Sequence, residues 1–420
     1  MNKYDIIVAG GGFAGVCAAV AAARLGKRTL LIEKEGSLGG AAVSSLVLPF
    51  MGYHTTVTDD SGNKSDLDLV RGIFAEIVAK LNALDGTGRH LFSTDRLKLV
   101  LDELVAASGC DVLFDSVIVD VNKSGRRIDG VCVYSLGRKY TFEADCFIDA
   151  TGDANLAALA GCEFWLGRDS DRLCQPMTLC FRVSGVPTKL LFEKRDEMQK
   201  VYAEQKKAGL LRNEREDLLY FTTIDPNVTH FNSTRVIKLD PTDPFALSKA
   251  EIEGRKQMFE LFELLRNNFD FCRDMKLVSS GSQIGVRESR MVKGEHRLTG
   301  DELVRTVKFP DAIAVGNYDI DIHNPTGSGT SHYFFRPGEF YTIPYSSIVA
   351  KDSDNLLVAG RCISCDHEAQ ASIRIMPICA AIGQAAGTAA AVLTEQKVAA
   401  READTEKIRK YLLSAGAFLG

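Results

Sequence analysis

Three glycines and one glutamate near the start of the chain have the types and spacing of a nucleotide-binding site. Gly10, Gly12 and Gly15 fit the pattern G-x-G-x-x-G, in which the missing side chains let the backbone approach a diphosphate. Glu33 follows 18 residues after Gly15, where an acid accepts hydrogen bonds from ribose hydroxyls. A glycine-rich turn with an incidental acid is the alternative, but it does not explain the order of strand, glycines, helix and acid. We therefore expect a dinucleotide cofactor.

Three later segments favour FAD over NAD as that cofactor. Gly39 and Gly40 give the backbone a second close approach, and residues 149–153 (DATGD) and 355–361 (NLLVAGR) each carry a glycine turn after an apolar run. A helix expected to begin near residues 376–377 would point its positive end at the flavin edge that gains negative charge on reduction. No second G-x-G-x-x-G follows a strand, so we expect no built-in NAD(P)H domain.

The best candidate for proton transfer is His323. Histidine titrates near neutral pH, and the alternation D-x-D-x-H puts Asp319, Asp321 and His323 on one face of a strand, where a carboxylate orients the imidazole. A structural histidine at a strand end is the alternative. His230 and Asn232 alternate in the same way, and they either line the substrate cavity or lie on the surface.

Arg287 and Tyr345 complete the predicted catalytic set. Arg287 would bind a substrate carboxylate through paired N–H donors, helped by Arg235, Arg290 and Arg374. A structural ion pair between these arginines and neighbouring acids fits the sequence equally well. Tyr345 would donate a proton or a hydrogen bond near the flavin, with a packed core tyrosine as the alternative.

Cys362 and Cys365 form a CxxC motif just after the last of the glycine turns. A CxxC beside a flavin is a candidate redox disulfide, which would make the protein a thiol–disulfide oxidoreductase. The 11 cysteines are scattered and mostly lie in apolar runs, which favours buried thiols in the reducing cytoplasm over a disulfide framework. The motif has no partner pair and no HxxxH companion, so no metal site is predicted.

The elements that must position these residues alternate between strand and helix at both ends of the chain. This order predicts an α/β, Rossmann-like domain with a parallel sheet. The middle of the chain lacks the alternation and predicts a smaller α+β substrate domain. Strands are expected at 4–9, 28–33, 111–121, 130–136, 145–149, 176–183, 218–224, 229–236 and 355–359; helices are expected at 13–25, 66–82, 94–107, 247–267, from 377 and at 404–413, with Asp66 and Thr94 as N-caps.

The length of 420 residues fits two domains and a tail. We expect a discontinuous FAD-binding domain at 1–165 and 335–395, a substrate domain at 166–334 and a helical tail at 396–420. The formal net charge of -5 argues against binding to nucleic acid or to anionic membranes. The longest weakly polar run, 375–393, predicts a buried helix rather than a membrane span.

These motifs resemble those of the bacterial FAD-dependent oxidoreductase family, within the glutathione-reductase-type flavoprotein superfamily. The pattern GGGxAG…E…GG is shared by many flavoproteins. The resemblance covers nearly the whole chain, and its more specific motifs are 284–290 (IGVRESR), 319–323 (DIDIH), 341–345 (YTIPY), 359–364 (AGRCIS), 374–377 (RIMP) and 383–387 (GQAAG).

The resemblance implies which residues bind FAD. One departure is Arg361, because many relatives carry an aspartate after the glycine of this motif; Arg361 would act electrostatically instead. The implied residues are Gly10, Gly12, Phe13, Ala14, Gly15, Glu33, Lys34, Gly39, Gly40 and Ala41 around the diphosphate and ribose; Val117, Ala150, Thr151, Gly152 and Asp153 on the ADP side; and Gly360, Arg361, Met376 and Pro377 on the ribityl and ring side.

Together the residues predict an FAD-dependent oxidoreductase, either a dehydrogenase or a reductase. It would transfer a hydride between the flavin and a small polar metabolite, carboxylated metabolites included. A separate electron donor or acceptor would serve the flavin. Two alternatives stay open, a thiol–disulfide oxidoreductase using Cys362 and Cys365 and a flavin-carrying electron-transfer subunit, and so does a homo-oligomeric state.

Overall fold

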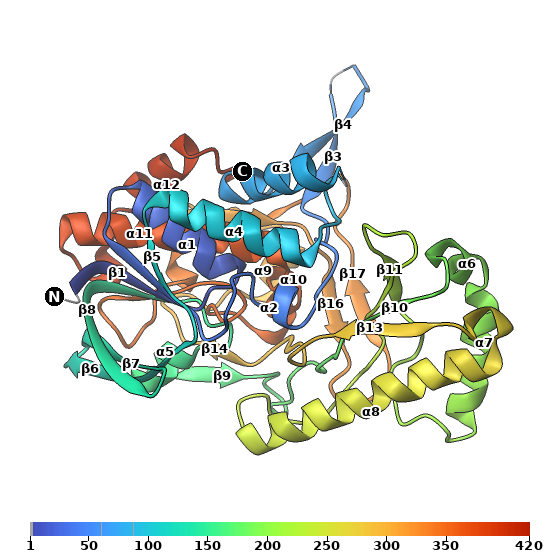
Figure 1. Cartoon of the computed structure of the whole chain (residues 1–420). Coiled ribbons are helices and arrows are strands. Elements are labelled where there is room, and N and C mark those ends of the chain that lie inside the picture. The colour runs from blue at the N-terminus through green and yellow to red at the C-terminus, as the bar shows by residue number, and fades with distance from the viewer. Residues whose placement is uncertain (1–2, 60, 87) are drawn as a thin grey trace.

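The computed structural model of the chain describes residues 3–59, 61–86 and 88–420, which form two lobes (Figure 1). The first lobe contains a seven-stranded sheet and helices from both ends of the chain. The second lobe is formed by the middle of the chain and contains a four-stranded sheet and the long helix α8, Pro244–Asn268. The two lobes have separate hydrophobic cores.

The large sheet is built around short, apolar, buried strands, as a parallel sheet covered on both faces requires. Its order is β5-β2-β1-β8-β7-β6, and β19 pairs with the end of β8. The pairs β1–β2, β1–β8, β2–β5 and β8–β19 are parallel, whereas β6, β7 and the start of β8 form an antiparallel meander. The strands are β1 Lys3–Ala9, β2 Thr29–Ile32, β5 Asp111–Leu113, β6 Ser116–Ser124, β7 Arg127–Ser135, β8 Arg138–Asp149 and β19 Leu356–Val358.

Helices α1 and α11 pack closely because glycines remove side chains from their contact. A Cβ atom at Gly383 or Gly387 of α11 would lie 2.0 Å from the carbonyl oxygen of Ala14 or Ala18 of α1. In the described part of the chain α11 is the one helix long and apolar enough to cross a membrane, but 89% of that stretch is buried inside the lobe. The larger helices here are α1 Phe13–Arg24, α3 Ile73–Asp85, α4 Thr94–Ser108, α11 Met376–Gln396 and α12 Thr405–Ser414.

Shorter elements complete the part of the chain outside the second lobe. The hairpin of β3 and β4 projects from the first lobe, and β16 pairs with β17 near the second lobe (Figure 1). The bounds are α2 Ala41–Ser44, β3 His54–Thr58, β4 Lys64–Asp68, α5 Asn155–Leu159, β9 Phe164–Leu166, β14 Arg290–Val292, α9 Gly300–Val304, β15 Ala312–Gly316, β16 Ile320–His323, β17 Thr330–Tyr333, β18 Tyr341–Pro344, α10 His367–Ile373 and the 3-10 helices Tyr345–Ser347 and Ala400–Glu402.

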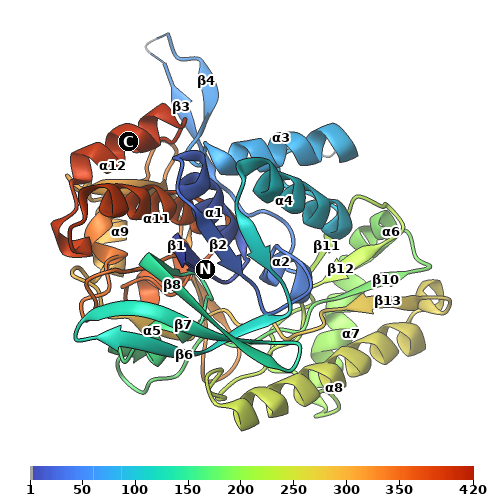
Figure 2. The ribbon, with the colours of Figure 1, turned by 60° about the vertical axis from the view of Figure 1, so that its left-hand side comes forward.

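The sheet of the second lobe has one apolar face and one polar face. Its order is β11-β12-β10-β13, all antiparallel, and Phe181 and Phe231 stack in the core. The opposite face carries Arg182, which donates to Oγ1 of Thr94 at the start of α4, 2.7 Å away, so this face is turned toward the first lobe (Figure 2). The remaining elements of the lobe are β10 Phe181–Ser184, α6 Thr188–Glu193, α7 Arg195–Lys207, β11 Tyr220–Thr222, β12 Thr229–Phe231, the 3-10 helix Asp270–Cys272 and β13 Lys276–Ser280.

Most of the expected elements are confirmed, but several boundaries are wrong. The strands expected at 176–183 and 229–236 are shorter, Phe181–Ser184 and Thr229–Phe231. Residues 64–68 form strand β4, so α3 begins at Ile73 and Asp66 is not its N-cap. The N-cap of α4 is Ser93 rather than Thr94. The run 111–121 is divided between β5 and β6 by a turn in which Asp115 has a φ of 48°.

The domain boundary predicted at residue 334 is also wrong. The second core ends at Ile284 and Val286, and β14 then pairs with β9 beside the first lobe. Buried apolar residues from Met291 onward belong to the first core, as do those of the tail through Leu419. The short strands after 290 have no regular alternation with helices, which is why they resembled the middle domain.

Candidate functional site

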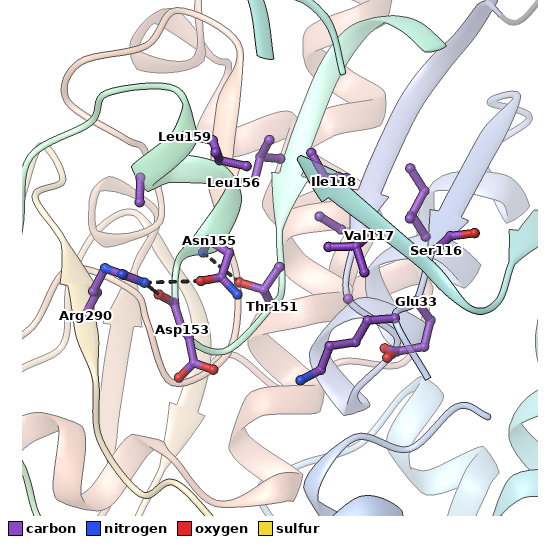
Figure 3. A pocket seen from close by; sticks show the side chains of 15 residues that line it. Glu33, Ser116, Val117, Ile118, Thr151, Asp153, Asn155, Leu156, Leu159 and Arg290 are labelled. Atoms are coloured by element: carbon purple, nitrogen blue, oxygen red, sulfur yellow. Dashed lines mark hydrogen bonds between the residues drawn. The ribbon is translucent and has the colours of Figure 1, made fainter. Parts of the chain in front are cut away.

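A cavity of about 450 Å³ opens where β1, β2 and β8 end and β6 begins (Figure 3). The carboxyl edge of a parallel sheet is where ligands bind in folds of this class. The lining includes the predicted residues Gly10, Glu33, Lys34, Val117, Thr151 and Asp153. The sequence did not predict Asn155, Leu156 and Leu159 of α5 here, because no local motif links them to the glycines, and it predicted Arg290 of β14 as a substrate-binding residue rather than as part of this cavity.

A groove of about 190 Å³ continues from this cavity past the start of α1 to the start of α11. The two cavities share Gly10, Glu33, Lys34, Thr151 and Asp153. The groove adds Arg374, which was expected to help bind the substrate, and residues that were not predicted, among them Ser45, Gln283, Val286 and Cys379. It also adds the predicted cofactor residues Gly12, Phe13, Ala14, Gly39, Gly40, Ala41, Ala150, Gly152, Gly360, Arg361 and Met376.

Two predicted cofactor residues do not line either cavity. A Cβ atom at Gly15 would lie 1.7 Å from the carbonyl oxygen of Gly10, so this glycine allows α1 to pack on the end of β1. Pro377 is buried in the first turn of α11. Both residues therefore shape the elements around the groove and do not contribute to its surface.

The glycines leave a cradle that fits the diphosphate of FAD. The N-cap of α1 is Gly12, which has no capping side chain, so the first N–H groups of the helix are free for phosphate oxygens. A Cβ atom at Gly12 would approach no protein atom closer than the Cα of Gly40, 3.8 Å away. Because Gly12 lines the groove, a side chain there would occupy cofactor space rather than meet protein.

Glu33 is held in place before any sugar binds. Its side chain accepts hydrogen bonds from the backbone N–H of Gly11 at 2.5 Å and of Glu35 at 2.8 Å, and the residue is buried. Burial raises the pKa of Glu33, although these two hydrogen bonds oppose the shift. Each carboxylate oxygen keeps a second lone pair, so the acceptor role toward ribose remains open to it.

Arg361 connects its own glycine turn, after β19, to the glycine turn after β8 and to the residue just before β14. Its guanidinium lies 2.6 Å from Oδ1 of Asp153 and 2.9 Å from Oγ of Ser289. Burial alone would raise the pKa of Asp153, but the charge of Arg361 and the hydrogen bond from Ser289 outweigh it and the pKa is lowered. Arg361, which stands where many relatives carry an aspartate, thus forms an ion pair with Asp153 at the wall of the groove.

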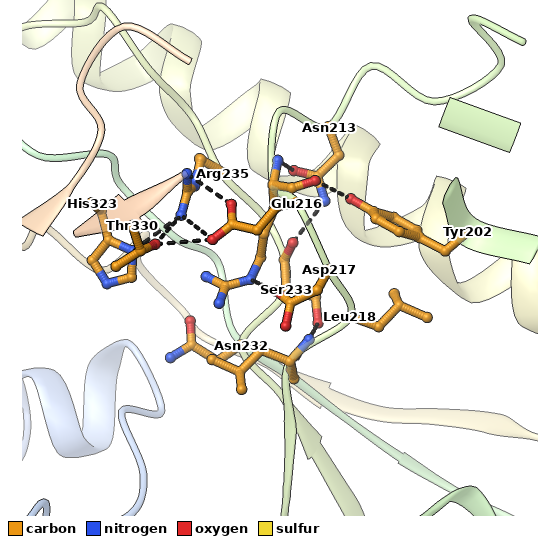
Figure 4. Close-up of polar contacts among 12 residues, drawn as sticks. Tyr202, Asn213, Glu216, Asp217, Leu218, Asn232, Ser233, Arg235, His323 and Thr330 are labelled. Atoms are coloured by element: carbon orange, nitrogen blue, oxygen red, sulfur yellow. Dashed lines mark hydrogen bonds and ion pairs between the residues drawn. The ribbon is translucent and has the colours of Figure 1, made fainter. Parts of the chain in front are cut away.

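From the groove a chain of polar contacts leads between the lobes to His323. Arg374 lines the groove, and its Nη2 lies 3.1 Å from Oδ2 of Asp321. The same oxygen lies 3.3 Å from Nε2 of His323. On the other side of the ring, Nη2 of Arg235 donates to Nδ1 of His323 at 3.1 Å, and Thr330 and Glu216 complete this group (Figure 4). Asp321 therefore contacts the imidazole, whereas Asp319 bonds to His332.

His323 is neutral, and its proton can be assigned. An arginine only donates, so Nδ1 of His323 accepts from Arg235 and the proton lies on Nε2, facing Asp321. Burial lowers the pKa of His323 to about 3, and the positive charge of Arg287 adds to the effect. The residue is 7% exposed. The Nε2–Oδ2 separation of 3.3 Å is long for a hydrogen bond, so another acceptor could replace it.

Arg287 lies near this network, as expected. Its Nη1 donates to the carbonyl oxygen of Pro176 at 2.7 Å and to Oγ1 of Thr178 at 2.5 Å, and its Nη2 lies 3.4 Å from Oδ1 of Asn232. Burial and, to a smaller extent, the nearby charge of Arg374 lower the pKa of Arg287 to about 9. The local positive charge is therefore only partly compensated.

Tyr345 was wrongly placed in the predicted catalytic set. It is 3% exposed, and its hydroxyl donates to the carbonyl oxygen of Ala400 at 2.7 Å. It lines neither cavity. The apolar surroundings that bury the phenol also raise its pKa well above the usual value, so Tyr345 has the environment of a core tyrosine.

The CxxC motif does not have the environment of a redox pair. Cys362 and Cys365 are both fully buried, and burial raises the pKa of each thiol well above its usual value. All 11 cysteines are free, and these two donate to the carbonyl oxygens of Ala359 and Ile363. Because the thiolate is the reactive form, the structure gives the thiol–disulfide alternative no support.

A family model described as FAD dependent oxidoreductase matches residues 5–412. Among curated proteins, the mitochondrial dihydrolipoyl dehydrogenase of Schizosaccharomyces pombe is 29% identical over 158 residues, which are 36% of this chain and 28% of that protein. The dihydrolipoyl dehydrogenase of Trypanosoma brucei brucei is 46% identical over 48 residues, 11% of this chain and 10% of that protein. The matched segments thus span less than a third of either relative.

Two solved structures illustrate the more distant similarities. A geranylgeranyl bacteriochlorophyll reductase-like protein from Thermoplasma acidophilum is 14% identical with a TM-score of 0.47, over 100% of this chain and 85% of that one. The p-nitrophenol 4-monooxygenase PnpA from Pseudomonas putida DLL-E4 is 11% identical with a TM-score of 0.47, over 99% of this chain and 85% of that one.

Proposed function

Because this chain belongs to the FAD-dependent oxidoreductase family, we propose that it transfers a hydride between FAD and a small polar metabolite bound between the two lobes. The observation that carries the proposal is that the cofactor groove meets a buried polar network at Arg374. That network contains His323 and Asp321 and lies near Arg287. The narrower placement in the glutathione-reductase-type superfamily remains part of the proposal.

FAD, when bound, supplies the chemistry of accepting or releasing a hydride at its ring. The chain's own residues bind and orient the metabolite. Arg374 and the N-terminus of α11 provide positive potential at the end of the groove where Met376 lies. Arg287 would bind a polar group of the metabolite through Nη2. The only side-chain contact of Nη2 among the described residues, with Asn232, is 3.4 Å long and therefore weak.

His323 would donate a hydrogen bond from Nε2 to the reacting oxygen or nitrogen of the metabolite, because Nδ1 already accepts from Arg235 and neither ring nitrogen is free to take up a proton. In the described structure that nitrogen faces Asp321 across 3.3 Å, and a hydroxyl or amino group could take the place of this long contact. Arg235 holds the opposite ring nitrogen and thereby keeps the orientation of the ring. A separate electron acceptor or donor would return the flavin to its starting state.

Anaerobic spectroscopy of the FAD-loaded protein tests the proposal. Hydroxy and amino compounds would be screened for bleaching of the flavin absorbance. Bleaching by such a compound supports the proposal. Bleaching only by a dithiol favours the thiol–disulfide alternative, and bleaching only with a partner redox protein favours an electron-transfer subunit.

Two variants test the residues in the same assay. His323→Asn should keep its flavin but reduce it roughly 100-fold to 1,000-fold more slowly, the usual cost of removing a positioned hydrogen-bond donor from the reacting group. Tyr345→Phe is the control, and its rate should match the unmodified protein. Equal rates for His323→Asn and the unmodified protein would remove His323 from the reaction.

A further inference from the structure

The polar face of the second lobe's sheet carries a half-buried arginine and a buried histidine that the proposed reaction does not use. Arg182 of β10 and His230 of β12 are cross-strand partners, so their side chains lie on the same face. That face is turned toward the start of α4, where Nη2 of Arg182 meets Oγ1 of Thr94. Figure 2 shows α4 beside β11 and β12.

His230 has hydrogen-bonding capacity that the protein does not satisfy. It is 0% exposed, yet neither ring nitrogen has a hydrogen-bond partner within the described ranges. The Nε atom of Arg182 likewise lacks one there. Buried polar groups normally have partners, and those that do not are expected to meet a ligand or water. Three such atoms on two neighbouring side chains point to a missing polar group.

The charge of the missing group is expected to be negative. Arg182 is a cation, and α4 spans 15 residues whose N-terminal turn faces it with a partial positive charge. The nearest acid on α4, Asp95, is mostly exposed and lies 3.0 Å from Lys98, and it acts on Arg182 only through its charge, without a direct contact. No acid among the described residues is within salt-bridge distance of Arg182.

We propose that Arg182, His230 and the first turn of α4 bind an anionic group, a carboxylate or a phosphate, at the far end of the substrate. This proposal rests on the proposed function, since it extends the same substrate. Arg287 binds Thr178, which lies four residues before Arg182 on the same side of the chain, about 13 Å away in an extended strand. The substrate is therefore an elongated molecule with a polar reacting end and an anionic far end.

Neighbouring side chains connect the two ends. Asn232 lies two residues from His230 on the same face, and its Oδ1 is 3.4 Å from Nη2 of Arg287. Cys180 lies between Thr178 and Arg182. Burial raises the pKa of its thiol, and the nearby charges of Arg287 and Arg182 both oppose that shift. The polar face is thus continuous from Arg287 through Asn232 to the pair Arg182 and His230.

Calorimetric titration of the FAD-loaded protein with inorganic phosphate, acetate and suberate tests this site. The unmodified protein should bind at least one probe saturably. Arg182→Gln and His230→Phe should each weaken that binding at least about 10-fold, because each removes a donor or a charge from a desolvated site. Tighter binding of phosphate identifies a phosphate terminus, and tighter binding of suberate than of acetate identifies an elongated carboxylate.

Two further variants separate recognition of the anion from loss of structure. Arg182→Lys keeps the cation and should bind the same probe within about 3-fold of the unmodified protein. Lys249→Gln, on the exposed face of α8, should leave binding unchanged. Equal binding by Arg182→Gln, or no saturable binding of any probe by the unmodified protein, would overturn the proposal. If no metabolite bleaches the flavin, the proposed function fails while these titrations still stand.

Discussion

At the scale of single residues, Gly12 and Gly15 lack side chains for different reasons. Gly12 faces the groove, and a Cβ atom there would have no protein neighbour closer than 3.8 Å. Gly15 faces the end of β1, and a Cβ atom there would lie 1.7 Å from the carbonyl oxygen of Gly10. The first glycine therefore leaves space for a ligand, and the second leaves space for the protein itself.

Substitution of the two glycines should give opposite results. Gly12→Val should fold normally and lose at least about 100-fold in FAD affinity, ~2.8 kcal/mol, because the side chain fills the diphosphate space. Gly15→Val should lower the free energy of unfolding by ~3 kcal/mol or more through overpacking. Flavin titration and denaturant unfolding would measure both. A Gly12→Val protein saturated with FAD at the normal affinity would contradict this reading of the groove.

The buried histidines make stability depend on pH. Burial lowers the pKa of His230 and of His323 to about 3, whereas an unfolded histidine titrates near ~6.5. Between these values the unfolded chain binds more protons, so the free energy of unfolding falls as pH falls, by ~1.4 kcal/mol per pH unit for each histidine. In His323→Asn the slope between pH 6 and 4 should shrink by about that amount. An unchanged slope in urea unfolding series would show that His323 is protonated in the folded protein.

The sequence predicted the residues near the glycines far better than those between the lobes. The glycines and Glu33 act through local backbone geometry, which a short motif specifies. Arg182 and Arg374 depend on contacts between segments far apart in the chain, so no spacing identifies Arg182, and Arg374 was expected to help bind the substrate without any sign that it joins the groove to Asp321. Tyr345 was misjudged because a tyrosine near a cofactor motif looks the same in sequence whether its hydroxyl meets a ligand or the backbone of Ala400.

At the scale of elements, the contact of α1 with α11 determines how the groove is closed. The start of α1 lies at the diphosphate end and the start of α11 at the opposite end, so a shift between these helices would displace both. Periodicity predicted both helices, but it contains no information on how closely they approach. In contrast, the start of the helix expected at 66–82 was wrong because residues 64–68 pair with β3, and strand pairing overrides local periodicity.

Gly383→Ala tests this contact in a case where two effects have opposite signs. Helix propensity alone favours alanine by about 1 kcal/mol inside a helix. Packing opposes it, because the new Cβ atom would lie 2.0 Å from the carbonyl oxygen of Ala14. We expect packing to dominate and the free energy of unfolding to fall by ~2 kcal/mol or more, with weaker FAD binding. Gly52→Ala, which has no atom near the new Cβ, is the control; a stabilised Gly383→Ala would mean that the helices can separate without loss.

At the scale of the whole molecule, the two lobes are joined where the chain crosses between them near residues 175 and 287. Gln370 of α10 binds both crossings: its Oε1 accepts from Gln175 at 3.0 Å, and its Nε2 donates to the carbonyl oxygen of Arg287 at 2.7 Å. Glu288 accepts from the backbone N–H of Gln175 at 2.7 Å and lies 2.8 Å from Nδ1 of His367. These buried bonds fix the polar face of the second lobe above the groove of the first.

Gln370→Ala should therefore loosen the lobes as well as destabilise the protein. The variant leaves two buried groups without partners, which lowers the free energy of unfolding by about 2–4 kcal/mol. Hydrogen exchange should quicken at residues 174–177 and 286–289, and turnover should fall because Arg287 is no longer fixed relative to Arg374. Gln199→Ala is matched to it, since Gln199 also makes two hydrogen bonds, both to Leu218 within the second lobe. If the control slowed turnover as much as Gln370→Ala, the stability of the second lobe rather than its attachment would control the reaction.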